Sequence, residues 1–286
     1  MIPKLSIGLI VFNGEKSIAN AITSLLDQTF TDFELFISDN GSTDSTQKIC
    51  QEFMKKDKRI IYFKQTINQG VDWNFRFVLN KASREYFMWA SDDDLWDPTF
   101  IEKNISNLKS KKTLVCSISE VDFFGPFKYR YDDPNQITKY RHVHPMSGIY
   151  LDKIKFYLKF KRSTMIYGIF RTEILKQNPV FEFSPKDLLV ILNVLKYGDF
   201  GVVDEILMHR SSGGMSSVGM IHSLKIMNVS NMGILFMYWP FIKWSFRNLG
   251  LKFIIKNILT FFELFYVGYG RIILDIFRVV KYRLKK

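Results

Sequence analysis

The sequence predicts an α/β fold built on a mostly parallel central sheet, and two patterns carry that prediction. Between residues 5 and 91, continuous apolar runs alternate with segments whose apolar residues recur at helical spacing. Continuous runs of this kind are typical of parallel strands that are buried on both faces. The order strand, helix, strand, helix, strand, helix, strand within about ninety residues is the pattern of right-handed parallel crossovers.

The individual elements follow from apolar runs, turn residues and helical periodicity. The expected strands are Leu5–Phe12, Phe33–Ser38, Arg59–Lys64, Tyr86–Ser91, Leu114–Asp122 and Phe200–Leu207. The expected helices are Glu15–Gln28, Ser45–Asp57, Val71–Ala82, Thr99–Ser110 and Pro185–Tyr197. Tyr167–Glu173 is expected to be a short strand that leads into a helix. Phe123–Ser147 is rich in aromatic residues, proline and charge, and it is expected to be a long loop.

Composition places the chain among globular proteins of a reducing compartment. It has 286 residues and is 47% hydrophobic and 16% aromatic, so it can bury a large core. Two cysteines, Cys50 and Cys116, exclude a disulfide framework and fit apolar core positions. The apolar run Leu5–Phe12 is too short for a secretory signal and lacks a small-residue cleavage site, so we expect a cytoplasmic N-terminus.

The basic excess of the chain lies in its C-terminal part. Residues 225–286 hold 11 Lys/Arg and 2 Asp/Glu, which accounts for +9 of the net charge of +12. We therefore expect two parts, an α/β domain at residues 1–220 and a helical region at residues 221–286. Ile226–Ile242 has no charged residue, but its 17 residues are at the lower limit for a membrane span and include Pro240.

Leu251–Lys286 combines a narrow polar stripe with a wide face of Ile, Leu, Phe, Tyr and Val. An apolar face beside basic residues is the pattern of a helix that lies in an anionic membrane surface. The alternative is that these helices pack on the first domain or on a second copy in a homodimer. Nucleic acid is a poor fit as a partner, because the basic residues alternate with aliphatic residues and not with exposed stacking aromatics.

Polar side chains follow three of the expected strands, where each strand ends. Asn13 follows the first, Asp39 the second, and Asp92–Asp94 the fourth. Ligands of such sheets bind at the carboxyl ends of the strands, so these residues are expected to lie at one edge. Three adjacent carboxylates repel each other unless a cation offsets them, and a divalent metal with oxygen ligands is the usual one. A solvated turn before the helix at Pro98 is the alternative, and the convergence of polar residues favours a site.

The segment LSIGLIVFNGEKSIANAITSLLDQTFTDFELFISDNGSTDST closely resembles the start of family 2 glycosyltransferases, which have the GT-A fold. The similarity continues through Asn68–Gly70, the acidic triplet with Trp96 and Pro98, Gly168–Arg171, and the segment from Lys186-Asp187 to His209-Arg210. It spans residues 4–216. The Asn-Gly-Ser-Thr-Asp loop and the Asp-Asp-x-Trp-x-Pro turn are together highly specific.

The resemblance implies transfer of a sugar from a nucleotide donor, usually a UDP- or dTDP-sugar, with a divalent metal, Mn²⁺ or Mg²⁺. It assigns roles residue by residue: nucleotide binding to Asn13, Asp39, Asp92 and Arg210, metal binding to Asp93 with Asp94 behind it, and the catalytic base to Asp187. His209 and Arg210 would lie in a Gly/Ser-rich loop near the diphosphate. Two positions depart from the family pattern, because Ser91 and Lys186 stand where the family usually has acids.

These expectations define a predicted function and an alternative. The chain is predicted to be an inverting glycosyltransferase that acts on a lipid-linked or polysaccharide acceptor. It would be peripheral on the inner face of the cell membrane. The alternative, suggested by Ser91 and Lys186, is a non-catalytic nucleotide-sugar-binding or scaffold subunit of a polysaccharide assembly complex.

Overall fold

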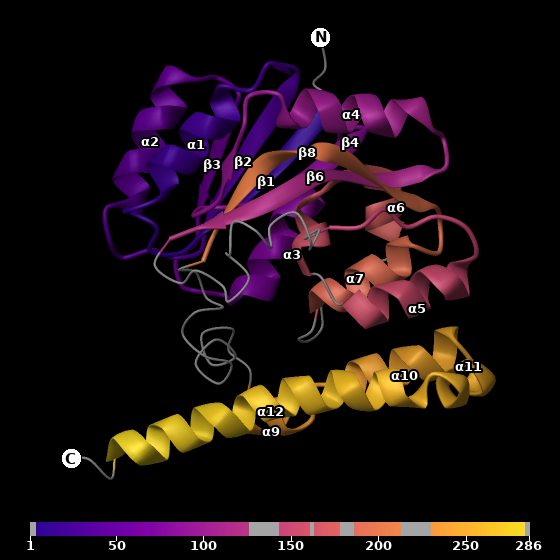
Figure 1. The fold of residues 1–286 in the computed structure, drawn as a ribbon. Helices are drawn as coiled ribbons and strands as arrows, with labels where there is room; N and C mark the ends of the chain where they lie inside the picture. The colour runs from indigo at the N-terminus through magenta and orange to yellow at the C-terminus, as the bar shows by residue number, and fades with distance from the viewer. Residues whose placement is uncertain (1–3, 126–142, 161–162, 178–185, 213–229, 284–286) are drawn as a thin grey trace.

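The computed structural model describes residues 4–125, 143–160, 163–177, 186–212 and 230–283. Within these residues an eight-stranded sheet carries helices on both faces, and four further helices form a layer beside it (Figure 1). The predicted α/β class with a mostly parallel sheet is therefore confirmed.

The sheet has the strand order β3-β2-β1-β4-β7-β6-β8-β5. The strands are β1 (Leu5–Val11), β2 (Phe33–Asp39), β3 (Ile60–Lys64), β4 (Tyr86–Ser91), β5 (Leu95–Trp96), β6 (Leu114–Phe124), β7 (Ile169–Arg171) and β8 (Asp199–Ser211). Only β5 and β7, among the described strands, run antiparallel to their neighbours. The parallel strands therefore all end at one edge of the sheet.

The centre of the sheet is formed by β1, β2 and β4, which are buried almost throughout. Because helices cover both faces, each strand position needs an apolar side chain, which explains the continuous apolar runs. The polar side chains in these otherwise apolar strands have hydrogen-bonding or charged partners. Ser6 donates a hydrogen bond to Glu34 Oε1 at 2.7 Å, and Arg84 contacts the other carboxylate oxygen at 2.8 Å. Such partners are what a buried carboxylate requires.

The helices of the sheet domain lie above and below this sheet in Figure 1, with α1, α2 and α4 on one face and α3 on the other. They are α1 (Ile18–Leu26), α2 (Thr46–Lys56), α3 (Val71–Lys81), α4 (Phe100–Ser110), α5 (Tyr150–Phe160), the 3₁₀ helix η2 (Ser163–Tyr167), α6 (Thr172–Gln177) and α7 (Lys186–Val194). Gly8 of β1 permits the close approach of α3, because a Cβ there would meet Val78 Cγ2 at 2.6 Å.

The C-terminal layer consists of α9 (Asn231–Leu235), α10 (Trp239–Asn248), α11 (Leu251–Lys256) and α12 (Ile258–Arg283). It lies beneath α5 and α7 in Figure 1. The Trp244 indole of α10 donates to Asn193 Oδ1 of α7 at 2.7 Å, and α12 packs against α5. Among the described helices, none is long and apolar enough to cross a membrane. The predicted boundary at residue 220 lies outside the described residues.

Several elements differ from those expected. The expected long loop begins later, because β6 extends to Phe124; its residues 126–142 are outside the described part of the chain. Helix α5 was not predicted, although Ile154, Tyr157 and Leu158 form a buried stripe at helical spacing. The last strand continues to Ser211 because β8 pairs with both β6 and β5. His209 and Arg210 are therefore strand residues and not loop residues.

Candidate active site

The predicted polar residues meet at the carboxyl edge of the sheet. The loop after β1, the loop after β2 and the turn after β4 all begin there, and β8 ends there beside the turn. Asn13 lies in the first loop, Asp39 at the start of the second, and Asp92–Asp94, which we call the acid turn, follow β4. The topology thus gathers residues that are far apart in sequence.

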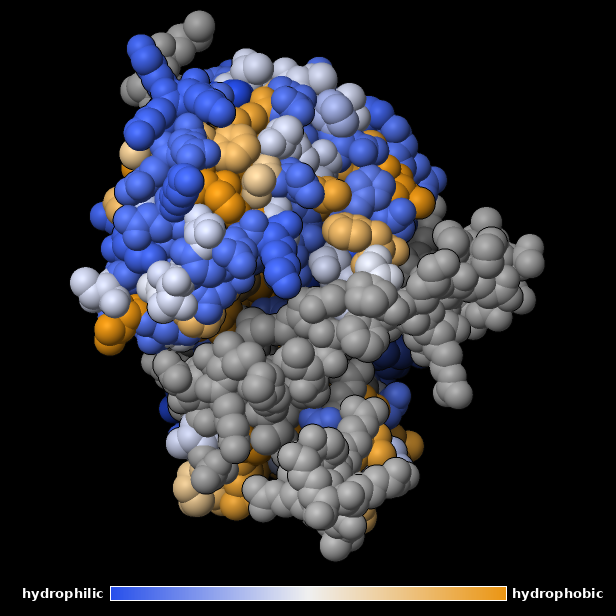
Figure 2. Space-filling model, turned by 90° about the vertical axis from the view of Figure 1, so that its left-hand side faces the viewer, coloured by the Kyte–Doolittle hydropathy of each residue, from blue (hydrophilic) through white to orange (hydrophobic). Residues whose placement is uncertain are grey.

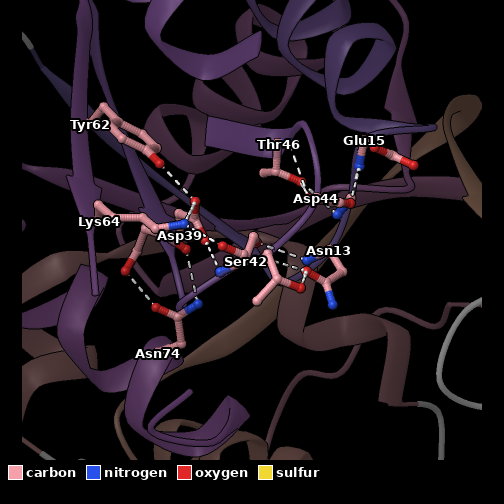
Figure 3. Close-up of polar contacts among 12 residues, drawn as sticks. Asn13, Glu15, Asp39, Ser42, Asp44, Thr46, Tyr62, Lys64 and Asn74 are labelled. Carbon is pink, nitrogen blue, oxygen red and sulfur yellow. Dashed lines mark hydrogen bonds and ion pairs between the residues drawn. The ribbon is translucent and has the colours of Figure 1, made fainter. Parts of the chain in front are cut away.

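Asp39 is a fully buried carboxylate at the end of β2. Tyr62 donates to Asp39 Oδ2 at 2.7 Å, and Lys64 Nζ lies 3.1 Å from the same oxygen (Figure 3). The backbone N–H of Ser42 donates to Oδ1 at 2.8 Å. Burial and the hydrogen bond to this carboxylate raise the pKa of Tyr62, so its hydroxyl stays protonated as a donor. Because these contacts hold the carboxylate in a fixed position next to the sheet edge, it is suited to accept hydrogen bonds from a ligand.

Asn13 ties the first two loops together. Its backbone has φ = 54°, a left-handed conformation that asparagine tolerates better than most residues. Its N–H donates to Ser42 Oγ at 2.8 Å, and its side-chain oxygen accepts from the Thr43 N–H at 2.9 Å (Figure 3). Since Ser42 also contacts Asp39, Asn13 and Asp39 lie in one hydrogen-bonded unit. Asn13 itself is exposed, whereas Asp39 is buried.

The three carboxylates of the acid turn have three different environments. Asp92 accepts from Ser17 Oγ at 3.3 Å and packs against Gly14, where a Cβ would collide with it. Asp93 Oδ1 accepts from Ser91 Oγ at 2.6 Å. Asp94 is 1% exposed and accepts from the Ser211 N–H and from Arg210 Nε, at 3.0 and 3.3 Å. Asp92 therefore faces the first loop, and Asp94 faces β8.

Burial raises the pKa values of two carboxyl groups in the acid turn. Burial, and then the charge of Asp93, raise the pKa of Asp92 to about 7. Burial also raises the pKa of Asp94 to about 6, although Arg210 opposes this shift. Near neutral pH, Asp92 therefore keeps its proton in a large fraction of molecules, and a bound cation would displace that proton.

The acid turn fits a divalent cation that is shared with a substrate. In the described residues, no group of three or more His, Cys, Asp or Glu side chains gathers to hold a metal alone. Mg²⁺-type sites commonly use one or two carboxylates and complete their shell with water and substrate phosphates. Asp93 and Asp92 have the oxygen chemistry for that, whereas both oxygens of Asp94 are already hydrogen-bonded to β8.

His209 is placed away from the acid turn, between two other carboxylates. Its Nδ1 lies 2.6 Å from Asp122 Oδ1, and its Nε2 lies 3.1 Å from Asp97 Oδ1. Burial lowers the pKa of His209, but the hydrogen bonds to Asp122 and Asp97 outweigh it, so the pKa is raised. A protonated imidazole can donate to both carboxylates at once. His209 therefore links β8, β6 and the residue before Pro98.

Asp187 lies in the first turn of α7 and is half-buried. Its charge helps to raise the pKa of two tyrosines, Tyr157 and Tyr167, whose burial is the main cause of the shift. The charges of Asp94 and Asp93 also raise the pKa of Tyr167, whereas the charge of Arg210 lowers it. Asp187 and the acid turn thus lie within electrostatic range of the same hydroxyl. The side chain of Lys186 is outside the described residues.

Sequence reasoning missed several side chains that complete this site. Tyr62, Lys64 and Ser42 surround Asp39, Ser17 contacts Asp92, and Tyr167 lies near Asp187. Ser42 stands in the Asn-Gly-Ser-Thr-Asp loop that the sequence singled out and could have been found there, whereas Ser17 falls within the helix expected at Glu15–Gln28. Nothing in the sequence distinguishes Tyr62 and Lys64 from other strand residues, so neither could be identified as a site residue.

With this geometry in place, the chain can be compared with known proteins. The family model described as "Glycosyl transferase family 2" matches residues 6–176, which is more than half of the chain. The chain belongs to glycosyl transferase family 2. It is therefore a glycosyltransferase, as the sequence predicted.

Curated glycosyltransferases match parts of the chain. A GalNAc(5)-diNAcBac-PP-undecaprenol beta-1,3-glucosyltransferase of Campylobacter jejuni is 39% identical over 93 residues, 32% of this chain and 30% of that protein. Chondroitin synthase of Escherichia coli is 30% identical over 115 residues, 40% of this chain and 17% of that protein. This glycosyltransferase chain thus spans less than two thirds of the length of these relatives.

Solved glycosyltransferase structures share the fold. Residues 1–349 of S. aureus TarS in complex with UDP align with a TM-score of 0.57 at 18% identity, covering 79% of this chain and 64% of that one. A Pyrobaculum calidifontis mannosyltransferase in complex with GDP-Man and Mn²⁺ aligns with a TM-score of 0.55 at 13% identity, covering 76% and 60%. The GT-A fold predicted for this family 2 member is confirmed.

Proposed function

We propose that this family 2 glycosyltransferase moves a sugar from a UDP-sugar to a lipid-linked or saccharide acceptor with inversion, assisted by Mn²⁺ or Mg²⁺. One observation carries the proposal: Asp39 and the acid turn both connect to the loop after β1 at the carboxyl edge of the sheet, Asp39 through Ser42 and Asn13, and Asp92 through Ser17. A similar fold binds UDP and UDP-GlcNAc in TarS. Another binds GDP-Man with Mn²⁺.

The donor would lie along the edge from Asp39 to the acid turn. Asp39 would offer its carboxylate to the nucleobase and ribose, with Oδ2 held by Tyr62 and Lys64 and Oδ1 held by the Ser42 N–H. Asn13, which is joined to Ser42, would contact the nucleotide next to Asp39, and Asp92 would lie toward the diphosphate. Asp93 would hold the cation, with its other oxygen oriented by Ser91. A bound divalent cation stabilises the diphosphate leaving group as its negative charge develops.

Asp187 would act as the base. The acceptor hydroxyl must lose a proton as it attacks the anomeric carbon, and a carboxylate opposite the leaving group can take that proton. One displacement of this kind inverts the anomeric centre. The position of Asp187 in the first turn of α7 also favours its ionised form, because a helix N-terminus stabilises negative charge. The ionised form is the one that accepts the proton.

A donor screen tests the proposal directly. We expect release of UDP from one or more of UDP-Glc, UDP-Gal, UDP-GlcNAc and UDP-GalNAc in the presence of Mn²⁺, with water or an added saccharide as acceptor. EDTA should abolish the release. Specific binding should also raise the apparent melting temperature by mass action, and Asp39→Asn should weaken that shift. Tight UDP binding without turnover of any donor would instead support a non-catalytic subunit.

We also propose that residues 221–286 are a separate region that holds the enzyme on the inner face of the cell membrane. Large apolar side chains of α11 and α12 are strongly exposed, among them Leu259 and Tyr266 at 80% and Phe262 at 62%. Figure 2 shows hydrophobic residues in the visible parts of the layer at the bottom, whereas the sheet domain above is mostly hydrophilic. Two lysines of α11, Lys252 and Lys256, are exposed as well. Apolar and basic groups together suit an anionic bilayer.

Vesicle flotation tests this membrane proposal. We expect the full chain to float with phosphatidylglycerol vesicles, because burying each exposed Leu or Phe contributes about 1.5–3 kcal/mol. Replacing Leu259, Phe262 and Tyr266 with Glu should reduce the bound fraction at least about tenfold. The matched control replaces Met54 and Ile61, exposed apolar residues of the sheet domain, with Glu and should float normally. A triple variant that floats normally but changes from dimer to monomer in sedimentation would favour the homodimer alternative.

A further inference from the structure

Arg210 at the end of β8 is enclosed by described groups on several sides. Its Nε contacts Asp94 Oδ2 at 3.3 Å, and its Nη1 donates to Thr164 Oγ1 at 3.4 Å. The guanidinium carbon lies 4.5 Å from the ring centroid of Tyr167 and 6.0 Å from that of Phe123. The third guanidinium nitrogen, Nη2, makes no hydrogen bond to the described residues. With respect to the described residues, Nη2 of Arg210 is therefore free to donate to a ligand.

The partner of Arg210 is the deeply buried end of the acid turn. Asp94 is 1% exposed, and its second oxygen accepts from the Ser211 N–H at 3.0 Å. A carboxylate in this environment depends on its cation, because an unpaired buried charge is strongly destabilising. The pair joins the acid turn to β8. The direction in which Arg210 points thus decides both how the acid turn is held and where Nη2 lies.

The packing around Tyr167 restricts its position. It is the last residue of η2, which packs between β4 and α7. The next residue, Gly168, is pressed against β6: a Cβ there would meet Cys116 Sγ at 2.6 Å and the Ser117 carbonyl oxygen at 2.9 Å. The backbone beside Tyr167 therefore cannot move toward the sheet. Helix η2, which ends at Tyr167, thus contacts both the strand that leads to Asp93 and the helix that carries Asp187.

We propose that Tyr167 is a positioning residue whose ring stacks on the Arg210 guanidinium and so fixes the acid turn and the free Nη2 of Arg210 for the donor diphosphate. This inference rests on the proposed donor site at the acid turn. The planar guanidinium stacks on an aromatic face and still donates hydrogen bonds in its own plane, which an ammonium group does not do. The ring of Tyr167, and not its hydroxyl, carries this role. Tyr167 thus acts on the donor only through Arg210.

Steady-state kinetics on Tyr167→Phe and Tyr167→Leu, with the UDP-sugar identified by the donor screen, separate the ring from the hydroxyl. Tyr167→Phe should keep kcat and KM within about twofold of the wild type, because the stacked ring remains. Tyr167→Leu should raise the donor KM, and the dissociation constant of UDP, about tenfold, the effect of losing a desolvated cation–π contact. The control variant, Tyr150→Leu, removes a ring of the same size from α5. Among the described groups, the Tyr150 hydroxyl donates a hydrogen bond only to the Leu192 carbonyl, so this variant should leave KM unchanged.

The outcomes are distinguishable. If Tyr167→Phe is impaired as much as Tyr167→Leu, the hydroxyl acts and the proposal is wrong. It is also wrong if Tyr167→Leu matches the wild type. Should Tyr167→Leu not fold, Arg210→Lys gives the same test, because lysine keeps the charge beside Asp94 but cannot stack in the same way; a wild-type KM there overturns the proposal. A wild-type protein that neither binds UDP nor turns over a donor contradicts the proposed function, and this inference with it.

Discussion

Replacing Asp187 with asparagine is expected to lower kcat for sugar transfer by about 10²–10⁴-fold, the usual contribution of a general base. The substitution keeps the size of the side chain but removes the group that accepts the acceptor's proton. The dissociation constant of UDP should stay within about twofold, because the nucleotide is expected to bind at Asp39, away from α7. Release of UDP from the donor measures the first quantity, and calorimetric titration with UDP measures the second.

A matched control separates catalysis from stabilisation of a helix terminus. Asp187 lies in the first turn of α7, and such acids also interact favourably with the helix dipole. Asp152 occupies the first turn of α5 and is exposed. Asp152→Asn should cost a few tenths of a kcal/mol of stability and leave turnover unchanged. If Asp187→Asn turned over the donor at the wild-type rate, the assignment of the base would be wrong.

Replacing Asp93 with asparagine is expected to lower Mn²⁺-dependent turnover at least about a hundredfold, since metal stabilisation of the leaving group amounts to several kcal/mol. Calorimetric titration of Mn²⁺ into the UDP complex should show a matching loss of affinity. Ser91→Ala, which removes only the hydroxyl that orients Asp93, should have a smaller effect in the same direction. An Asp93→Asn variant that binds Mn²⁺ as the wild type does would exclude Asp93 as the ligand.

The pH dependence of the Mn²⁺ affinity can be measured by repeating this calorimetric titration at several pH values. Burial and the neighbouring Asp93 raise the pKa of Asp92 to about 7, so Asp92 carries a proton in a large fraction of molecules below that pH. Mn²⁺ has to displace this proton. The affinity of the wild type should therefore rise as the pH increases from about 6 to about 8. In Asp93→Asn this rise should be weaker, because one cause of the raised pKa is gone.

The fold was predictable because its central strands carry an unambiguous pattern. In β1, β2 and β4, nearly every position is buried, and the sequence shows this as unbroken apolar runs followed by turn residues. The location of Asp39 and the acid turn at one edge follows from parallel topology alone. The β5 strand could not be predicted in this way. It has two residues, and only its pairing with β8 defines it.

The side chains around the predicted acids depend on strand register, which the sequence does not specify. Lys64 reaches Asp39 because parallel pairing of β2 with β3 puts the two residues opposite each other. A shift of one residue would turn Lys64 to the other face of the sheet. The contacts of His209 also depend on strand pairing that the sequence does not specify. The resemblance suggested a loop position near the diphosphate, whereas continued pairing of β8 directs its ring to Asp97 and Asp122.

The most direct test of a single displacement at this site is the configuration of the sugar that is first released. Proton NMR can follow the wild-type enzyme with Mn²⁺ and the α-linked UDP-sugar that the donor screen identifies, before the free sugar equilibrates. With Asp187 as base on the side opposite the diphosphate, we predict that the β anomer appears first. Initial appearance of the α anomer would contradict the proposed inverting mechanism and the role of Asp187 in it.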